Sequence, residues 1–176
     1  IRDRVSGAKL IRFRHNDIND LENKISKFDK NNHSLLVIVE SLYSMEGSLA
    51  PLKEIVEICK NYKAKLFVDE AHALGIIGKN GRGLSNDFKN SINIISGTFG
   101  KSFGSGGAFL ACNEIISHKI IQNSGAFRYT TALAPALAAA ALLSLKKIKE
   151  NENWGSELLK ISKRWKKEIL NLGNFN

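Results

Sequence analysis

The sequence contains only two cysteines, no long apolar run and no internal repeat, and each shortage removes a class of protein. Cys59 and Cys112 lack any CxxC or Cys/His spacing, so neither a metal site nor a disulfide framework is predicted. No segment approaches the ~18 consecutive apolar residues that a membrane span needs, and we expect no span. These shortages predict a protein of the reducing cytoplasm.

The chain also has no initiator methionine and no charged-then-apolar leader at Ile1. We therefore expect this start to lie inside a longer protein. The length of 176 residues fits one domain with a piece of another, at roughly 100 to 200 residues per domain. A polar stretch over 150–153 suggests a turn, so we expect a large domain over 1–150 and the start of a smaller one over 151–176.

Positive charge is in excess, because 26 Lys and Arg against 17 Asp and Glu give a formal charge of +9. This excess fits either an acidic partner, such as nucleic acid, anionic lipid or the phosphates of coenzyme A, or solvated helix faces. Interleaving with apolar residues at helical spacing favours the solvated faces, and we expect no nucleic-acid partner. The residues concerned are Lys146, Lys147, Lys149, Lys160, Lys163, Arg164, Lys166 and Lys167.

Alternating apolar patterns predict an α/β fold. A helix capped by Asn16 carries one apolar stripe, at Ile18, Leu21, Ile25 and Phe28. Strands over 35–40 and 66–69 flank a helix that begins near Pro51, which makes a βαβ unit with a parallel pair. Strands over 92–96 and 107–112 are joined by a loop too short for a crossover helix, so the second is expected to be antiparallel or to follow a tight irregular loop. Helices over 114–123, 135–149 and 154–170 follow.

Two short patterns resemble parts of an ATPase. The strand LFVDEAH (66–72) resembles the metal-binding strand of DEAH-box helicases, and Gly100-Lys101-Ser102 resembles the end of a P-loop. A P-loop has another glycine separated from Gly-Lys-Ser by four residues, a position where this chain has Ile95. The phosphate loop would also follow the DEAH strand instead of preceding it. Both observations speak against a nucleic-acid motor.

The same segments fit a site for pyridoxal phosphate (PLP), an electron sink whose ring nitrogen must stay protonated and whose aldehyde and phosphate must be held. Asp69 ends a parallel strand, where α/β ligands bind, and can keep the pyridinium charged. Lys101 can bond the aldehyde within the small-residue loop SGTFGKSFGSGG (96–107), and Thr98 suits the phosphate. Taken singly, Asp69 is better explained as a helix cap and Lys101 as a solvated lysine, but their joint occurrence favours the cofactor.

Four segments resemble, in order and approximate spacing, the signatures of the α-oxoamine synthases. They are ESLYSMEG (40–47), VDEAHALGIIGKNGRG (68–83), SGTFGKSFGSGG (96–107) and FRYTTALAP (127–135). The resemblance runs across nearly the whole chain. It implies a truncated large domain of PLP-dependent transferase fold type I, the aspartate-aminotransferase type, with a mainly parallel sheet flanked by helices. It also implies condensation of an amino acid with an acyl-CoA and loss of carbon dioxide.

The resemblance further implies roles for matching residues. Lys101 would hold the cofactor and move protons at the substrate α-carbon, Asp69 would pair with the ring nitrogen, and His72 would hydrogen-bond the phenolic oxygen. Ser44 would lie beside the cofactor, and Thr98 would hold its phosphate. Because one cofactor touches them all, we expect Lys101 and Asp69 to open into one cleft with His72 beside it.

Thr130, with Thr131, would reach the phosphate bound by the partner subunit, which makes a homodimer part of the site. Family members are much longer, and their glycine-rich segment and ring-stacking histidine lie in an amino-terminal half that this chain lacks. We therefore expect exposed apolar surface around 35–39 and 66–68 and on the alanine-rich helix.

Within the family, ESLYSMEG and TFGKSFG favour the biotin-pathway branch, which uses L-alanine and a pimeloyl thioester. The alternatives are another branch of the family or a non-catalytic partner subunit of such an enzyme. Retention of Lys101, Asp69 and His72 argues against the non-catalytic subunit.

Overall fold

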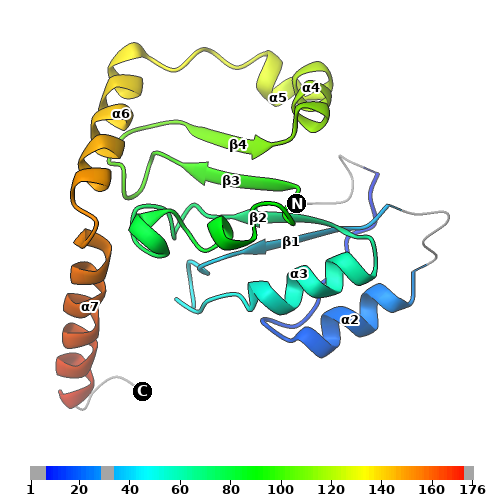
Figure 1. Cartoon of the computed structure of the whole chain (residues 1–176), viewed down its shortest axis with the longest axis horizontal. Coiled ribbons are helices and arrows are strands. Elements are labelled where there is room, and N and C mark those ends of the chain that lie inside the picture. The colour runs from blue at the N-terminus through cyan, green and yellow to red at the C-terminus, as the bar shows by residue number, and fades with distance from the viewer. Residues whose placement is uncertain (1–6, 29–33, 173–176) are drawn as a thin grey trace.

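The computed structural model describes residues 7–28 and 34–172 and shows a four-stranded sheet with helices around it (Figure 1). The strands are β1 (Leu36–Glu40), β2 (Lys65–Asp69), β3 (Ile94–Thr98) and β4 (Ala108–Cys112), in the spatial order β1-β2-β3-β4. The pairs β1–β2 and β2–β3 are parallel, and β4 is antiparallel to β3. The expected mainly parallel sheet is confirmed, and of the two alternatives for the last strand the structure has the antiparallel one.

Helices connect and flank these strands. The α-helices are α2 (Ile18–Ser26), α3 (Leu52–Asn61), α4 (Glu114–Asn123), α5 (Gly125–Arg128), α6 (Pro135–Glu150) and α7 (Trp154–Asn171). The crossover from β1 to β2 is α3, as predicted. The connection from β2 to β3 contains only the short 3-10 helices η1 (Lys79–Gly81) and η2 (Ser85–Phe88).

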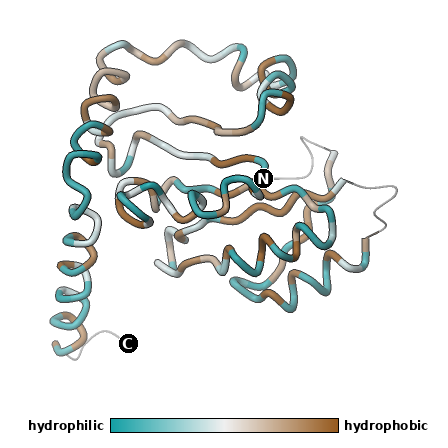
Figure 2. The backbone as a smooth tube through the Cα atoms, viewed as in Figure 1, coloured by the Kyte–Doolittle hydropathy of each residue, from teal (hydrophilic) through white to brown (hydrophobic). Residues whose placement is uncertain are grey.

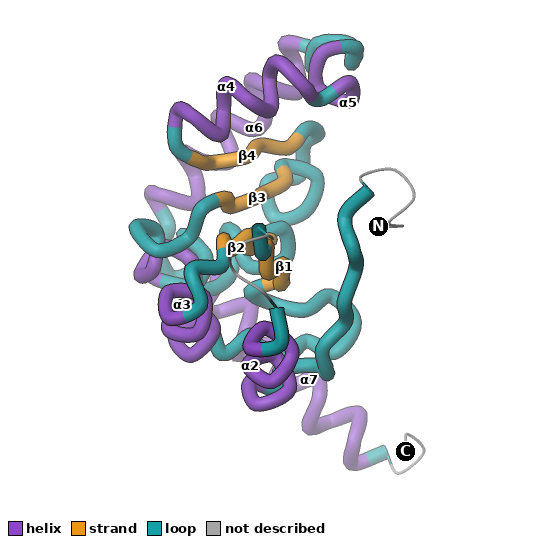
Figure 3. Tube along the Cα trace, turned by 90° about the vertical axis from the view of Figure 1, so that its right-hand side faces the viewer, coloured by secondary structure: helices purple, strands orange, loops and turns teal. Residues whose placement is uncertain are grey.

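One face of the sheet packs on α2 and α3, which Figure 3 shows together on one side of the strands. Alternate residues of a strand point to opposite faces, so β1 and β2 each send a set of side chains to these helices. The resulting core contains Val37, Val39, Leu66 and Val68 from the strands, and Leu21, Ile25, Leu52, Ile55, Ile58 and Cys59 from the helices. This face is the hydrophobic centre of the described chain.

Other apolar side chains remain exposed. On the opposite face of β1, Leu36 is 50% exposed and Ile38 is 49% exposed. The hydrophobic colouring in Figure 2 also extends over α6, whose exposed residues include Leu137, Leu142, Leu143 and Leu145. The predicted exposure of apolar surface is thus confirmed on the alanine-rich helix and, within 35–39, at Leu36 and Ile38. The prediction was wrong for the alternate strand residues, which point into the core on the α3 side: Val37, Val39, Leu66 and Val68.

The start and end of the first helix differ from the prediction. Asp17, not Asn16, is the N-cap, because its side-chain oxygen accepts a hydrogen bond from the Asp20 amide at 2.8 Å. Asn16 instead adopts a left-handed conformation with φ of 53°. The helix ends at Ser26, which leaves Phe28 outside it.

The carboxyl-terminal part of the described chain is helical. Helix α6 ends at Glu150 and α7 begins at Trp154, so the expected domain boundary falls in the turn between them. The division into two domains stays a prediction, and its residues 1–6, 29–33 and 173–176 lie outside the described part. Over the described ranges, no helix combines the length and the apolar character that crossing a membrane requires.

Candidate active site

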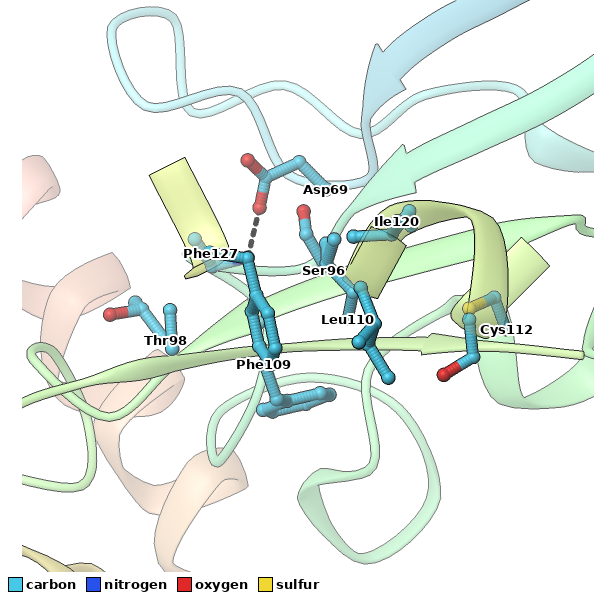
Figure 4. Close-up of a pocket in the computed structure, with 13 residues that line it drawn as sticks. Asp69, Ser96, Thr98, Phe109, Leu110, Cys112, Ile120 and Phe127 are labelled. Carbon is cyan, nitrogen blue, oxygen red and sulfur yellow. Dashed lines mark hydrogen bonds between the residues drawn. The ribbon is translucent and has the colours of Figure 1, made fainter. Parts of the chain in front are cut away.

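The carboxyl ends of β1, β2 and β3 meet at one edge of the sheet, because the three strands are parallel. The strand register pairs Asp69 with Ser96 and Ser96 with Leu110. Paired residues point to the same face, so these three side chains form one row across the sheet, as Figure 4 shows.

A pocket of about 560 Å³ lies over this row. Asp69, Ser96 and Thr98 supply polar atoms, whereas Leu110, Ile120 and Phe127 supply apolar surface from β4, α4 and α5 (Figure 4). Small-molecule sites have this general composition, with a few polar groups in an otherwise apolar cavity of roughly 300 to 1,000 Å³.

Asp69 is half-buried, and its two carboxylate oxygens have different surroundings. Oδ1 accepts a hydrogen bond from the Ala71 amide at 2.8 Å, which closes the first turn after β2. For Oδ2, no partner occurs within the residues that the structure describes. Asp69 therefore does act as a local cap, and it still keeps one oxygen for a ligand in the pocket.

Ser96 was not predicted as a site residue. Its Oγ is buried and has no hydrogen-bond partner in the described part of the chain. A buried hydroxyl without a partner costs about 1–3 kcal/mol, so this position calls for a polar ligand atom or a water. The sequence could have indicated Ser96 by its spacing, because residues two apart in a strand share a face and Ser96 lies two residues before Thr98.

Thr98 lines the same pocket, and its hydroxyl both donates and accepts a hydrogen bond. Oγ1 donates to the Gly107 carbonyl at 3.1 Å and accepts from the Gly100 amide at 3.1 Å. These two bonds join the start and the end of the loop over 99–107. Thr98 thus links the pocket to the loop that carries Lys101.

Lys101 is exposed in that loop and does not line the pocket. The loop leads into β4, whereas a P-loop leads into a helix, so the ATPase alternative has no structural support. Three serine hydroxyls anchor the loop and its surroundings: Ser102 Oγ donates to the Leu74 carbonyl at 2.5 Å, Ser105 Oγ to the Leu137 carbonyl at 2.7 Å and Ser144 Oγ to the Phe103 carbonyl at 2.7 Å.

Ser44 belongs to the turn that follows β1. It is exposed, and its amide donates to Glu40 Oε2 at 3.2 Å. The neighbouring Tyr43 ring meets the His15 ring edge-on at a centroid distance of 4.4 Å. Burial, with the carboxylates of Glu40 and Glu46, raises the pKa of Tyr43, so its phenol stays protonated at neutral pH.

The remaining predicted residues lie outside the pocket. His72 is half-buried in the turn that follows Asp69, and Thr130 and Thr131 are exposed between α5 and α6. The structure therefore brings Asp69 and Thr98 together and adds Ser96. The expected common cleft for Lys101 and Asp69 is not found in this pocket, and the roles assigned to the predicted residues stay predictions.

Comparison with known proteins gives a consistent set of matches. A family model described as aminotransferase class I and II matches residues 4–172. The 8-amino-7-oxononanoate synthase of Hahella chejuensis is 36% identical over 173 residues, which are 96% of this chain and 43% of that protein. The predicted similarity to the α-oxoamine synthases is thereby confirmed.

Solved structures give the same result. Serine palmitoyltransferase of Sphingomonas wittichii has a TM-score of 0.87 and 32% identity, over 94% of this chain and 42% of that chain. A structure of SPT with PLP has a TM-score of 0.80 and 34% identity, over 87% of this chain and 39% of that chain. The chain thus spans less than half the length of the proteins it matches.

Proposed function

Because the chain belongs to the class I and II aminotransferase family, we propose that the full-length protein is a PLP-dependent α-oxoamine synthase, which condenses an amino acid with an acyl-CoA and releases carbon dioxide. The observation that carries the proposal is the pocket where the unpartnered oxygen of Asp69 and the unpartnered hydroxyl of Ser96 lie side by side. The names of the relatives supply the reaction class.

The residues present fit the cofactor. Asp69 offers a carboxylate for a ring nitrogen, and Ser96 offers a hydroxyl in need of a partner. Thr98 ends the same strand, and its hydroxyl would turn its proton from the Gly107 carbonyl to a phosphate oxygen. PLP, when bound, supplies an electron sink that stabilises negative charge at the substrate α-carbon. The protein's task is to hold the ring cationic and to orient the bond that breaks.

Each side chain then has a distinct task. The carboxylate of Asp69 keeps the ring nitrogen protonated, because an adjacent anion favours the charged form of a base. The Lys101 amine holds the cofactor aldehyde and moves a proton at the substrate α-carbon. His72 donates to the phenolic oxygen, Ser44 lies beside the cofactor, and Thr98 binds the phosphate.

The active protein is a homodimer in this proposal, with Thr130 and Thr131 reaching the phosphate bound by the partner subunit. Their exposure on a stretch without secondary structure between α5 and α6 supports such a reach. The scarcity of cysteine supports a cytoplasmic location. The small domain begins after α6, near residue 151.

For the substrates we favour L-alanine and a pimeloyl thioester, the reaction of 8-amino-7-oxononanoate synthase in biotin biosynthesis. The motifs ESLYSMEG and TFGKSFG and the name of the Hahella relative support this choice. The similarity to serine palmitoyltransferase supports the alternative of L-serine with a long-chain acyl-CoA.

The test is an assay of the full-length protein with PLP. Alanine, glycine and serine are each combined with pimeloyl-CoA, acetyl-CoA and palmitoyl-CoA, and the release of coenzyme A and carbon dioxide is measured. We expect the fastest turnover with alanine and pimeloyl-CoA. Turnover with serine and palmitoyl-CoA would favour the alternative, and absence of turnover with every pair would refute the proposed reaction class.

Lys101→Ala separates chemistry from folding. We expect it to abolish the visible absorbance of the bound cofactor and to lower turnover by about a thousandfold or more, with an unchanged unfolding midpoint, because the side chain is exposed. The matched control is Lys53→Ala on the exposed face of α3, which should change neither. Normal turnover in Lys101→Ala would contradict the assignment.

A further inference from the structure

Glu70 directly follows Asp69 and is the one charged side chain, within the described ranges, that is fully buried, at 1% exposure. Strand alternation points it away from Asp69, towards the side of Val68 and the core. Long charged side chains are almost never buried without partners. Its partners therefore indicate what the residue does.

The Glu70 carboxylate joins two segments that come from different strand ends. Oε2 accepts from the Ser41 hydroxyl at 2.6 Å, just beyond β1. Oε1 accepts from the Ser85 amide in η2, at the end of the turn that follows β2. Ser41 and Ser85 are as deeply buried as Glu70, at 0% and 1% exposure, so neither bond competes with water.

The space around the carboxylate is also fitted to it. Gly83 lies against Glu70 with φ of 79°, and a Cβ at this position would lie 2.4 Å from Oε2. The backbone continues the same connection, because the Ser41 amide donates to the Asp69 carbonyl and the Glu70 amide donates to the Ser96 carbonyl, both at 2.9 Å. The carboxylate of Glu70 thus joins Ser41 and Ser85, while its backbone continues the pairing of β2 with β3.

We propose that Glu70 is a positioning residue that fastens the loop carrying Ser44 and the turn carrying His72 to the strand end that carries Asp69. The inference rests on the proposed function for its consequence, since those three side chains are among the residues assigned to the cofactor. Glu70 touches neither the pocket nor a ligand and acts only through Ser41 and Ser85. Its loss should let the three segments move independently.

The experiment compares Glu70→Gln and Ser41→Ala with wild type in the full-length protein freed of cofactor. Glutamine keeps the size of the side chain but replaces one acceptor with a donor, so the Ser41 hydroxyl would have to accept where it now donates, and its own proton would lose the carboxylate. The matched control is Glu57→Gln on the exposed face of α3. Hydrogen exchange is followed over 41–50 and 70–88, and the PLP dissociation constant is measured by absorbance titration.

For Glu70→Gln we expect faster exchange in both segments and PLP affinity weaker by about tenfold, the size of one charged hydrogen bond. For Ser41→Ala we expect faster exchange in 41–50 and a smaller loss of affinity, and the double variant should add less than the sum because the sites are coupled. Glu57→Gln should match wild type in all measurements.

A lower unfolding midpoint with unchanged PLP affinity in the folded protein would overturn the positioning role and leave a purely structural one. Unchanged exchange in both segments would also overturn it. If Glu70→Gln does not fold, Ser41→Ala decides by the same two measurements. Failure of the wild type to bind PLP would instead refute the proposed function. The hydrogen-exchange data would still test, independently of PLP, whether Glu70 holds the two segments in place.

Discussion

The chain divides into a self-packed region, residues 18–103, and an open region, residues 104–172, and the two differ in how they bury apolar side chains. Apart from Ala141, the buried apolar side chains of the described ranges all lie between Leu21 and Phe103. The open region exposes large apolar residues along α6 and α7, among them Leu142 and Trp165. The first region thus makes its own core, whereas the second presents surface that its own residues do not cover.

The candidate pocket lies where the two regions meet. Asp69, Ser96 and Thr98 come from the self-packed region, and Leu110, Ile120 and Phe127 come from the open one. The polar residues of the pocket therefore lie on the better-packed elements, and its apolar wall lies on the less-packed ones. We expect changes in the open region to alter the shape of the pocket more than they alter the stability of the fold.

The largest expected effect concerns the chain by itself. Residues 1–176 expressed alone should aggregate and release no carbon dioxide with PLP, alanine, glycine or serine and several acyl-CoAs, because the open region leaves a large apolar surface in water. Gel filtration and the turnover assay measure both properties. A stable monomer with turnover would show that the apolar surface of the open region does not have to be buried by other residues.

The next effect is on stability. Ile55→Ala in the self-packed region should cost about 2–5 kcal/mol of unfolding free energy in the full-length protein, because it leaves a cavity in the core. Leu142→Ala is the matched change in the open region and should cost less. Urea unfolding measures both. A larger cost for Leu142→Ala would reverse the comparison and locate a second core on α6.

Each region contains one cysteine, and their reactivities should differ. Burial raises the pKa of the Cys59 thiol to about 11, so its thiolate fraction at pH 8 is about a hundredfold below that of an ordinary thiol. Cys112, half-buried on β4 in the pocket wall, should react first with a thiol reagent. Kinetics of wild type and Cys112→Ser measure the difference, and fast labelling of native Cys112→Ser would contradict it.

The raised pKa of Cys59 also makes the free energy of unfolding depend on pH. The folded state favours the protonated thiol, so this contribution is present below pH 9, the ordinary pKa, and is lost as the pH rises towards 11. Cys59→Ala should remove that part of the alkaline slope.

The smallest effect is expected on α7. Arg164 and Glu168 approach to 3.6 Å on exposed side chains, and such pairs contribute about 0.5 kcal/mol or less. Glu168→Gln should leave the unfolding midpoint of the full-length protein nearly unchanged. A loss above about 1 kcal/mol would show that this part of α7 is docked against other residues rather than solvated.

Local patterns were sufficient for much of the fold. The apolar run before Glu40 and the run before Asp69 gave both strands, and the short loop after β3 gave the antiparallel β4. The start of β3 was placed two residues early, at Ile92. The Leu66 amide donates to the side chain of Asn93 at 2.8 Å, and the strand begins at Ile94. A side-chain bond to a neighbouring strand depends on tertiary contacts that the local pattern does not contain.

The site was predicted in part for the same reason. Asp69 was found because it ends a predicted strand, and strand ends of parallel sheets converge. Thr98 was found from its hydroxyl within the small-residue loop, because the predicted strand stopped at Ser96, two residues short of the end of β3. Ser96 and Glu70 were missed, because a serine without a partner and a glutamate between two buried serines are recognised only when the strand register is known. Ile55 and Cys59 differ from them, since a spacing of four residues is enough to put both on the buried side of α3.

Helix α7 is long, and it contacts the turn after β2 near its first residue. Its 18 residues span about 27 Å at 1.5 Å per residue. Gly155, in its first turn, lies so close to the turn after β2 that a Cβ there would be 2.1 Å from the Ile76 carbonyl oxygen. Contact at one end and exposure along the rest make that turn a pivot. A tilt of about 10° there would carry the far end of α7 through about 5 Å, so a small change in the turn after β2 would become a large displacement at Asn171.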